Sequence, residues 1–73
     1  MCKEDLIKSL KDNNYLLTDV DFKSKCLMFT KKTEYSLEED IRFDKIISEY
    51  KDLNFEYSFD NLGLSIGVLI WFK

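Results

Sequence analysis

Asp19, Asp21 and Asp60 are the side chains whose types and spacing come closest to a chemical site in this sequence. Asp19 and Asp21 are two positions apart in a segment with the alternation of a β-strand, so their carboxylates should share one face. With Asp60 they could hold a divalent cation, because hard cations prefer carboxylate oxygens. A polar, solvated outer face explains the same residues more simply, and we predict no metal site and no cofactor.

The groups that other catalytic mechanisms need are missing from the sequence. It contains no histidine, which removes the commonest general base and metal ligand and any Cys–His or Ser–His pair. Gly63 and Gly67 are its only glycines, too few for a glycine-rich loop around a phosphate. The other carboxylates fall on predicted turns and on a solvated helix face. We predict that the chain is not an enzyme.

Length and composition predict one small domain over residues 1–73. Hydrophobic residues make up 45% of the chain and aromatic residues 15%, which favours a globular fold over disorder. The net charge of −3 argues against direct nucleic-acid binding, which usually uses a basic face. Four lysines are clustered and could form a local basic rim: Lys23, Lys25, Lys31 and Lys32. A simpler explanation is that they keep turns and a sheet edge soluble.

Cysteine usage and the N-terminal residues predict a cytoplasmic protein. Cys2 and Cys26 are far apart and form no Cys-x-x-Cys pair, so we expect two reduced thiols, with Cys26 as a small apolar side chain in a strand. The charged N-terminus lacks the apolar segment of a signal peptide. The longest apolar run, Val68–Phe72, is too short to cross a bilayer, and no membrane association is predicted.

The first half of the chain predicts a helix followed by a hairpin. Lys3–Lys11 has one apolar stripe, with Asn13 and Asn14 as a left-handed stop. Strands are predicted over Tyr15–Phe22 and Cys26–Lys31; the second is apolar on both faces, which favours an interior position in the sheet. The first strand is expected to place Leu16, Thr18, Val20 and Phe22 on one face and Tyr15, Leu17, Asp19 and Asp21 on the other.

The second half predicts another helix. Ser36 and Glu39 fit a capping box in which the Glu39 side chain reaches back to the helix start, placing a helix over Leu37–Lys51. Leu37 and Ile41 fall off the inward stripe; either they cover a sheet edge or the first turn is irregular. The stripe itself is expected to consist of Phe43, Ile46, Ile47 and Tyr50, with Leu53 continuing it.

The C-terminal residues predict the second hairpin. Apolar and polar residues alternate over Leu53–Asp60 and again over Leu64–Lys73, with Asn61-Leu62-Gly63 as the turn between them. The inward face of the last strand is expected to be Leu64, Ile66, Val68, Ile70 and Phe72. The whole chain therefore predicts a two-layer αββαββ fold of the α+β class, with a four-stranded antiparallel or mixed sheet and two helices mainly on one face.

In that arrangement one face of the sheet has no helix to cover it. Leu69 and Trp71 point to this face, where Met28 and Cys26, together with Tyr15 and Leu17, could join them. Exposed apolar patches often mark binding surfaces, and tryptophan is enriched at interface hot spots. Two alternatives remain open: one helix crosses the opposite face, or the sheet curls and buries both sides.

Glu38, Glu39 and Asp40 form an acidic run at the start of the second predicted helix. Acidic residues at a helix N-terminus are stabilised by the helix dipole, and this structural explanation is sufficient. The functional alternative is an acidic surface that docks on the basic, nucleic-acid-binding groove of another protein. We include these three residues with Met28, Leu69 and Trp71 as candidate partner-binding residues.

In general character the chain resembles the small acidic proteins that phages and mobile elements encode against host defence, such as anti-CRISPR inhibitors. The resemblance rests on its size, its charge, the run Glu38-Glu39-Asp40, the lack of catalytic residues, and a composition rich in Lys, Asn, Ile and Phe that fits an AT-rich genome. It implies a protein that occludes a site on a larger host protein, in the host cytoplasm. The alternative is a homo-oligomeric protein that pairs through the Trp71 face.

Overall fold

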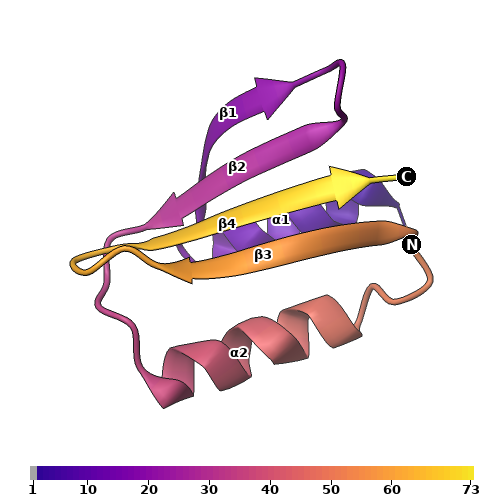
Figure 1. Cartoon of the computed structure of the whole chain (residues 1–73). Helices are drawn as coiled ribbons and strands as arrows, with labels where there is room; N and C mark the ends of the chain where they lie inside the picture. The colour runs from indigo at the N-terminus through magenta and orange to yellow at the C-terminus, as the bar shows by residue number, and fades with distance from the viewer. Residues whose placement is uncertain (1) are drawn as a thin grey trace.

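The computed structural model describes residues 2–73, which fold into two helices and four strands in the predicted αββαββ order (Figure 1). The sheet order is β1-β2-β4-β3 and every neighbouring pair is antiparallel, which confirms the α+β prediction. The interior position predicted for the second strand is also confirmed. The elements are α1 (Lys3–Asp12), β1 (Leu16–Asp21), β2 (Cys26–Lys31), α2 (Leu37–Ser48), β3 (Phe55–Asn61) and β4 (Ile66–Phe72).

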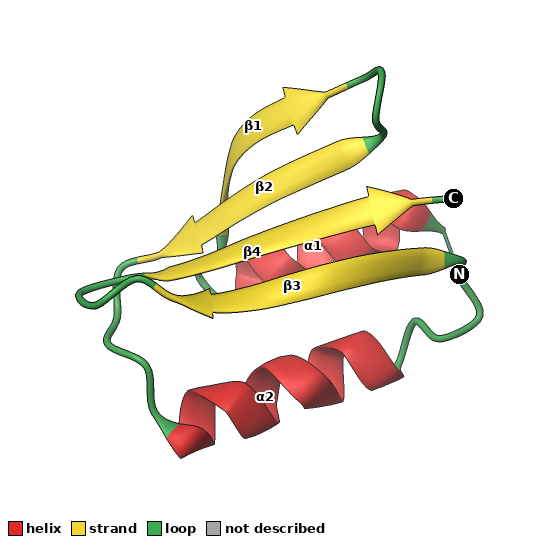
Figure 2. Cartoon of the chain, viewed as in Figure 1, coloured by secondary structure: helices red, strands yellow, loops and turns green. Residues whose placement is uncertain are grey.

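Both helices pack on the same face of the sheet. Figure 2 shows α1 passing behind β4 and β3 while α2 runs beneath β3. Phe43 of α2 is fully buried and its ring contacts the rings of Tyr15, Tyr57 and Phe59. The side chains of both helices and of the inward sheet face form a single core: Leu6, Leu10, Tyr15, Leu27, Phe29, Phe43, Ile46, Ile47, Tyr50, Ile66, Val68 and Ile70.

Strand β4 holds the sheet together because it pairs with β2 on one side and with β3 on the other. Its alternate residues Ile66, Val68 and Ile70 are completely buried beneath the helices, as the period of two predicts. Leu64 was expected on the same face, but this prediction is wrong. The hairpin turn is longer than predicted, β4 begins only at Ile66, and Leu64 lies in the turn with 80% of its surface exposed.

A bulge in β1 changes the faces predicted for the first strand. The register with β2 slips between Leu17 and Asp19, so Thr18 is an extra residue and the alternation reverses there. Tyr15 is therefore buried and Leu17 packs against the core, whereas Leu16 is 61% exposed on the opposite face. Val20 packs inward as predicted. Phe22, expected on the same strand face, lies beyond the strand and is exposed.

Helix α2 ends at Ser48, three residues earlier than predicted, but Tyr50 in the following turn is still buried. The Ser36 hydroxyl accepts a hydrogen bond from the backbone N–H of Glu39, which confirms the cap at the helix start. The Glu39 side chain does not follow the capping-box prediction, because its carboxylate binds Lys31 and Arg42. Leu37 and Ile41 cover no sheet edge: they are 70% and 56% exposed on a regular helix.

Candidate protein-binding surface

The sheet face opposite the helices, called the outer face below, carries a central apolar group. Directly opposed residues in antiparallel strands share a face, so the pairs Met28–Leu69 and Cys26–Trp71 lie side by side on β2 and β4. Met28 is 40% exposed, while Leu69 and Trp71 are half-buried. The structure therefore brings together three of the six predicted contact residues. Tyr15 and Leu17, which were expected to join them, point into the core because of the bulge in β1.

Carboxylates flank this apolar centre on both edge strands. Asp19 and Asp21 oppose Met28 and Cys26 from β1, and Glu56 opposes Trp71 from β3. Glu56 is paired with Lys73 at 2.7 Å, and this hydrogen bond and the Lys73 charge lower the pKa of the Glu56 carboxyl. Asp60 lies on the same face farther along β3. The outer face thus has an apolar middle between two acidic edges.

The structure separates the three aspartates considered as a metal site. Asp19 and Asp21 are on the edge strand β1, whereas Asp60 is on the opposite edge strand and in register with Gly67. The two strands β2 and β4 lie between them. Within residues 2–73, no three Cys, Asp or Glu side chains lie close enough together to hold a metal ion. The metal hypothesis is wrong for this triplet.

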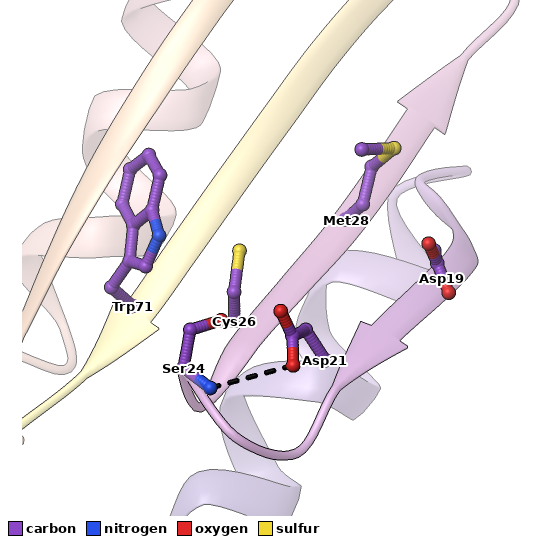
Figure 3. Close-up of a pocket in the computed structure, with 6 residues that line it drawn as sticks. All are labelled: Asp19, Asp21, Ser24, Cys26, Met28 and Trp71. Atoms are coloured by element: carbon purple, nitrogen blue, oxygen red, sulfur yellow. Dashed lines mark hydrogen bonds between the residues drawn. The ribbon is translucent and has the colours of Figure 1, made fainter.

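A hollow of about 270 Å³ lies at one end of the outer face (Figure 3). It is lined by side chains from β1, the following turn, β2 and β4, so three strands and a turn position it. Figure 3 shows the Trp71 ring on one side, the Cys26 thiol between, and the Asp21 carboxylate on the other side. The lining residues are Asp19, Asp21, Ser24, Cys26, Met28 and Trp71.

Local hydrogen bonds hold Asp21 in place at the edge of the hollow. Its carboxylate accepts the backbone N–H groups of Lys23 at 3.0 Å and of Ser24 at 3.4 Å. Hydrogen bonds from the Ser24 side chain and from these N–H groups lower the pKa of the Asp21 carboxyl. Asp21 therefore presents a fixed negative charge at neutral pH and below.

The acidic start of α2 is more engaged within the molecule than the sequence suggests. Glu39 is only 8% exposed, so it does not belong to an acidic outer surface. Arg42 pairs with the exposed Glu38 at 2.9 Å, and the Tyr35 hydroxyl donates to Asp40 at 2.8 Å. Only Glu38 and Asp40 remain accessible from the predicted run, and both already have partners. The outer face is the better candidate for a contact surface.

A buried polar cluster surrounds Glu39. Its carboxylate pairs with Lys31 at 2.9 Å and with Arg42 at 3.2 Å, and the Lys31 ammonium lies 5.1 Å from the centre of the Tyr15 ring. The Tyr15 hydroxyl is buried without a well-formed hydrogen bond among residues 2–73. Burial and the nearby negative charge of Glu39 raise the pKa of Tyr15 to about 12. The cluster joins β2 and α2 to Tyr15, the residue just before β1, which is a structural role.

A second groove lies on the helix side, between α1 and the first hairpin. Ile7, Val20 and Phe72 contribute to its apolar floor, and Phe22, 88% exposed, lines it as well. The Lys3 ammonium lies 5.2 Å from the centre of the Phe72 ring. Sequence reasoning missed this groove because it places Phe22 inside a strand. It missed the hollow because the hollow needs the alignment of β1, β2 and β4.

No family model, curated protein or solved structure matches this chain. Both cysteines are free thiols, as expected. Within residues 2–73, neither helix has the length and apolar character needed to cross a bilayer.

Proposed function

We propose that this chain is a non-enzymatic module that binds another protein through the outer face of its sheet. The observation that carries the proposal is the adjacency of Met28, Leu69 and Trp71 on a face that neither helix covers. Methionine and aromatic residues are enriched at protein interfaces, and partly exposed tryptophans often contribute most of the binding energy. A rigid sheet also presents these side chains in a fixed arrangement, which lowers the entropic cost of binding.

The finer proposal concerns the partner. A small acidic module is suited to occluding a basic site on a larger protein, and the acidic edges of the outer face support that choice. We propose a phage or mobile-element inhibitor that acts in the host cytoplasm on a host protein, including nucleic-acid-binding or CRISPR-type effectors. Glu38 and Asp40 would then form an accessory contact beside the main surface. The basis is the general character of the sequence, not a shared motif.

Self-association through the Trp71 face is the second candidate function. A two-fold dimer would bring the acidic edges of two copies close together, because each copy has Asp19 and Asp21 on one edge strand and Asp60 on the other, while the Glu56 charge is compensated by Lys73. Like charges facing each other across an interface oppose association. This repulsion favours a different, basic partner over a second copy.

Co-purification from the lysate of a low-GC bacterium tests the main proposal. The tagged wild-type chain is compared with Trp71→Ser and Met28→Lys, which alter the centre of the outer face. Phe22→Ser is the matched control, because it also replaces an aromatic side chain by serine, but in the helix-side groove. We expect a partner that the wild type and Phe22→Ser retain and that both outer-face variants lose.

The variants are first compared by circular dichroism and thermal unfolding, so that loss of binding is not confused with loss of folding. Met28→Lys is the safer variant because Met28 is 40% exposed and a lysine can extend into solvent. If folded Trp71→Ser and Met28→Lys proteins both retain every partner of the wild type, the proposed surface is wrong.

A further inference from the structure

The hollow beside Trp71 has walls of two different kinds. On the β1 side it is bordered by the carboxylates of Asp19 and Asp21, which occupy alternate positions of the edge strand. On the β4 side it is bordered by the indole of Trp71, the only tryptophan of the chain. Figure 3 shows Cys26 and Met28, both with their sulfur atoms drawn, between these two sides. A guest in the hollow therefore meets anionic oxygens, polarisable sulfur and an aromatic ring.

Among residues 2–73, neither a lysine nor an arginine lines the hollow. Lys25 follows Ser24 in the turn, but Lys25 and Lys73 line the helix-side groove, which Asp21 also borders from its other side. The Lys73 ammonium is in addition paired with Glu56. Within the hollow the carboxylates of Asp19 and Asp21 therefore face no basic side chain of residues 2–73. An anionic guest is excluded by this charge, and a neutral apolar guest would leave two carboxylates without compensation.

A cation that also has a flat, weakly hydrated surface fits both kinds of wall. The guanidinium group of arginine can stack on an indole ring while its N–H groups bind carboxylate oxygens. The ammonium of lysine is compact and strongly hydrated, so it loses more on leaving water and uses the ring less well. We infer that the hollow receives an arginine side chain of the partner protein, with its guanidinium between Trp71 and Asp21. This inference rests on the proposed protein-binding function.

Asp21 is the residue that fixes the guest. The N–H groups of Lys23 and Ser24 hold its carboxylate at 3.0 and 3.4 Å, so the acceptor is in place before the guest arrives. Asp19, also on β1, supplies a second charge nearby. One prepared acceptor and one ring define a site for a single side chain rather than a diffuse acidic surface.

Titration with small capped amino acids tests the inference without the partner. The probes are N-acetyl-arginine N-methylamide, the lysine analogue, and the citrulline analogue, which has the shape of arginine but no charge. Binding is followed by NMR shifts of the Trp71 indole N–H and the Met28 methyl group. We expect saturable shifts with the arginine probe and dissociation constants at least about fivefold higher for the other two. Equal binding of citrulline or lysine, or shifts confined to other surfaces, would overturn the inference.

Variants complete the test. Asp21→Asn removes the charge but keeps an oxygen that can accept the N–H groups of Lys23 and Ser24, so we expect weaker arginine binding in a folded protein. Met28→Lys places a competing ammonium in the hollow and should abolish binding. Asp60→Asn is the matched control, because it removes the same charge from the same face away from the hollow. If Asp60→Asn weakens arginine binding as much as Asp21→Asn does, the net charge of the protein explains the effect, and the proposed arginine site is wrong.

The outcome is distinguishable from that of the co-purification experiment. If the arginine probe fails to bind while Trp71→Ser still loses the partner, the inference falls and the proposed function stands. If the folded outer-face variants retain every partner, the proposed function falls and the partner arginine falls with it.

Discussion

The Lys31 ammonium lies 2.9 Å from the Glu39 carboxylate, and the two side chains keep only 13% and 11% of their exposure. This ion pair joins the end of β2 to the first turn of α2. The chain between these two elements forms no helix or strand. Arg42 donates to the same carboxylate at 3.2 Å. The position of α2 on the sheet therefore depends on a buried charge as well as on apolar contacts.

Removing the carboxylate should destabilise the fold. In Glu39→Ala the mostly buried Lys31 ammonium loses its partner, and an unpaired buried charge is unfavourable. We expect the free energy of unfolding to fall by about 2 kcal/mol, measured by urea denaturation. Glu38→Ala is the control, because that side chain is 76% exposed in its pair with Arg42 and should change the free energy by less than about 0.5 kcal/mol. Equal effects of the two substitutions would contradict the structural role of Glu39.

Stability at high pH should depend on Tyr15. Its pKa is raised to about 12 in the folded protein by burial and by Glu39, whereas an unfolded tyrosine has its ordinary pKa of 10.0. Between these values the folded state binds one proton more than the unfolded state, so the free energy of unfolding must fall as the pH rises. The contribution is about 1.4 kcal/mol per pH unit for one group.

The measurement is urea denaturation at intervals from pH 9 to pH 11.5, in wild type and in Tyr15→Phe. Other groups that titrate in this range are common to both proteins, so the difference between the two slopes isolates Tyr15. We expect the slope of the variant to be less negative. Identical slopes would show that the Tyr15 phenol ionises equally easily in the folded and unfolded protein.

The sequence predicts the order and class of the elements because its hydrophobic periods are clear. Ile66, Val68 and Ile70 alternate without interruption, and Leu6 and Leu10 mark one side of a helix. The bulge at Thr18 has no such signal, since the segment around it alternates equally well in either phase. A one-residue slip exchanges the two faces of a strand, which is why Tyr15 and Leu16 were assigned to the wrong sides.

For the candidate surface as well, the sequence predicts some features and leaves others out. Met28, Leu69 and Trp71 could be placed on one face because they alternate with the residues expected to pack beneath the helices. Glu39 could not be recognised as buried, because its partner Lys31 is on another element and the run Glu38-Glu39-Asp40 looks uniform in sequence. Residues of the hollow become neighbours only through pairing between three strands. Long-range register is the information that a single sequence does not carry.

The two glycines should respond differently to alanine. Gly63 has φ of +90° in the hairpin turn, a conformation unfavourable for other residues although the space around it is open. A Cβ on Gly67 would come 2.9 Å from Leu62 Cδ1, the end of a flexible side chain on a residue that is 59% exposed and can rotate away. We expect Gly63→Ala to lower the free energy of unfolding by about 1 kcal/mol and Gly67→Ala to change it by less. Urea denaturation of the two variants measures both changes. A larger decrease in the free energy of unfolding for Gly67→Ala would show that the Leu62 side chain cannot rotate away.

The charge of the outer face should keep the protein monomeric. Two copies that met through Trp71 would place the acidic edges of both sheets near each other, and this repulsion is strongest at low salt. We expect sedimentation velocity at low micromolar concentration and low ionic strength to give a monomer of about 8.7 kDa. A variant neutralised at Asp19, Asp21 and Asp60 by Asn should associate more readily through the same apolar centre, with Glu56 kept as the partner of Lys73. A stable wild-type dimer with a buried Trp71 would instead favour self-association as the function, and Met28→Lys, which adds a charge to the centre of that interface, should then dissociate it.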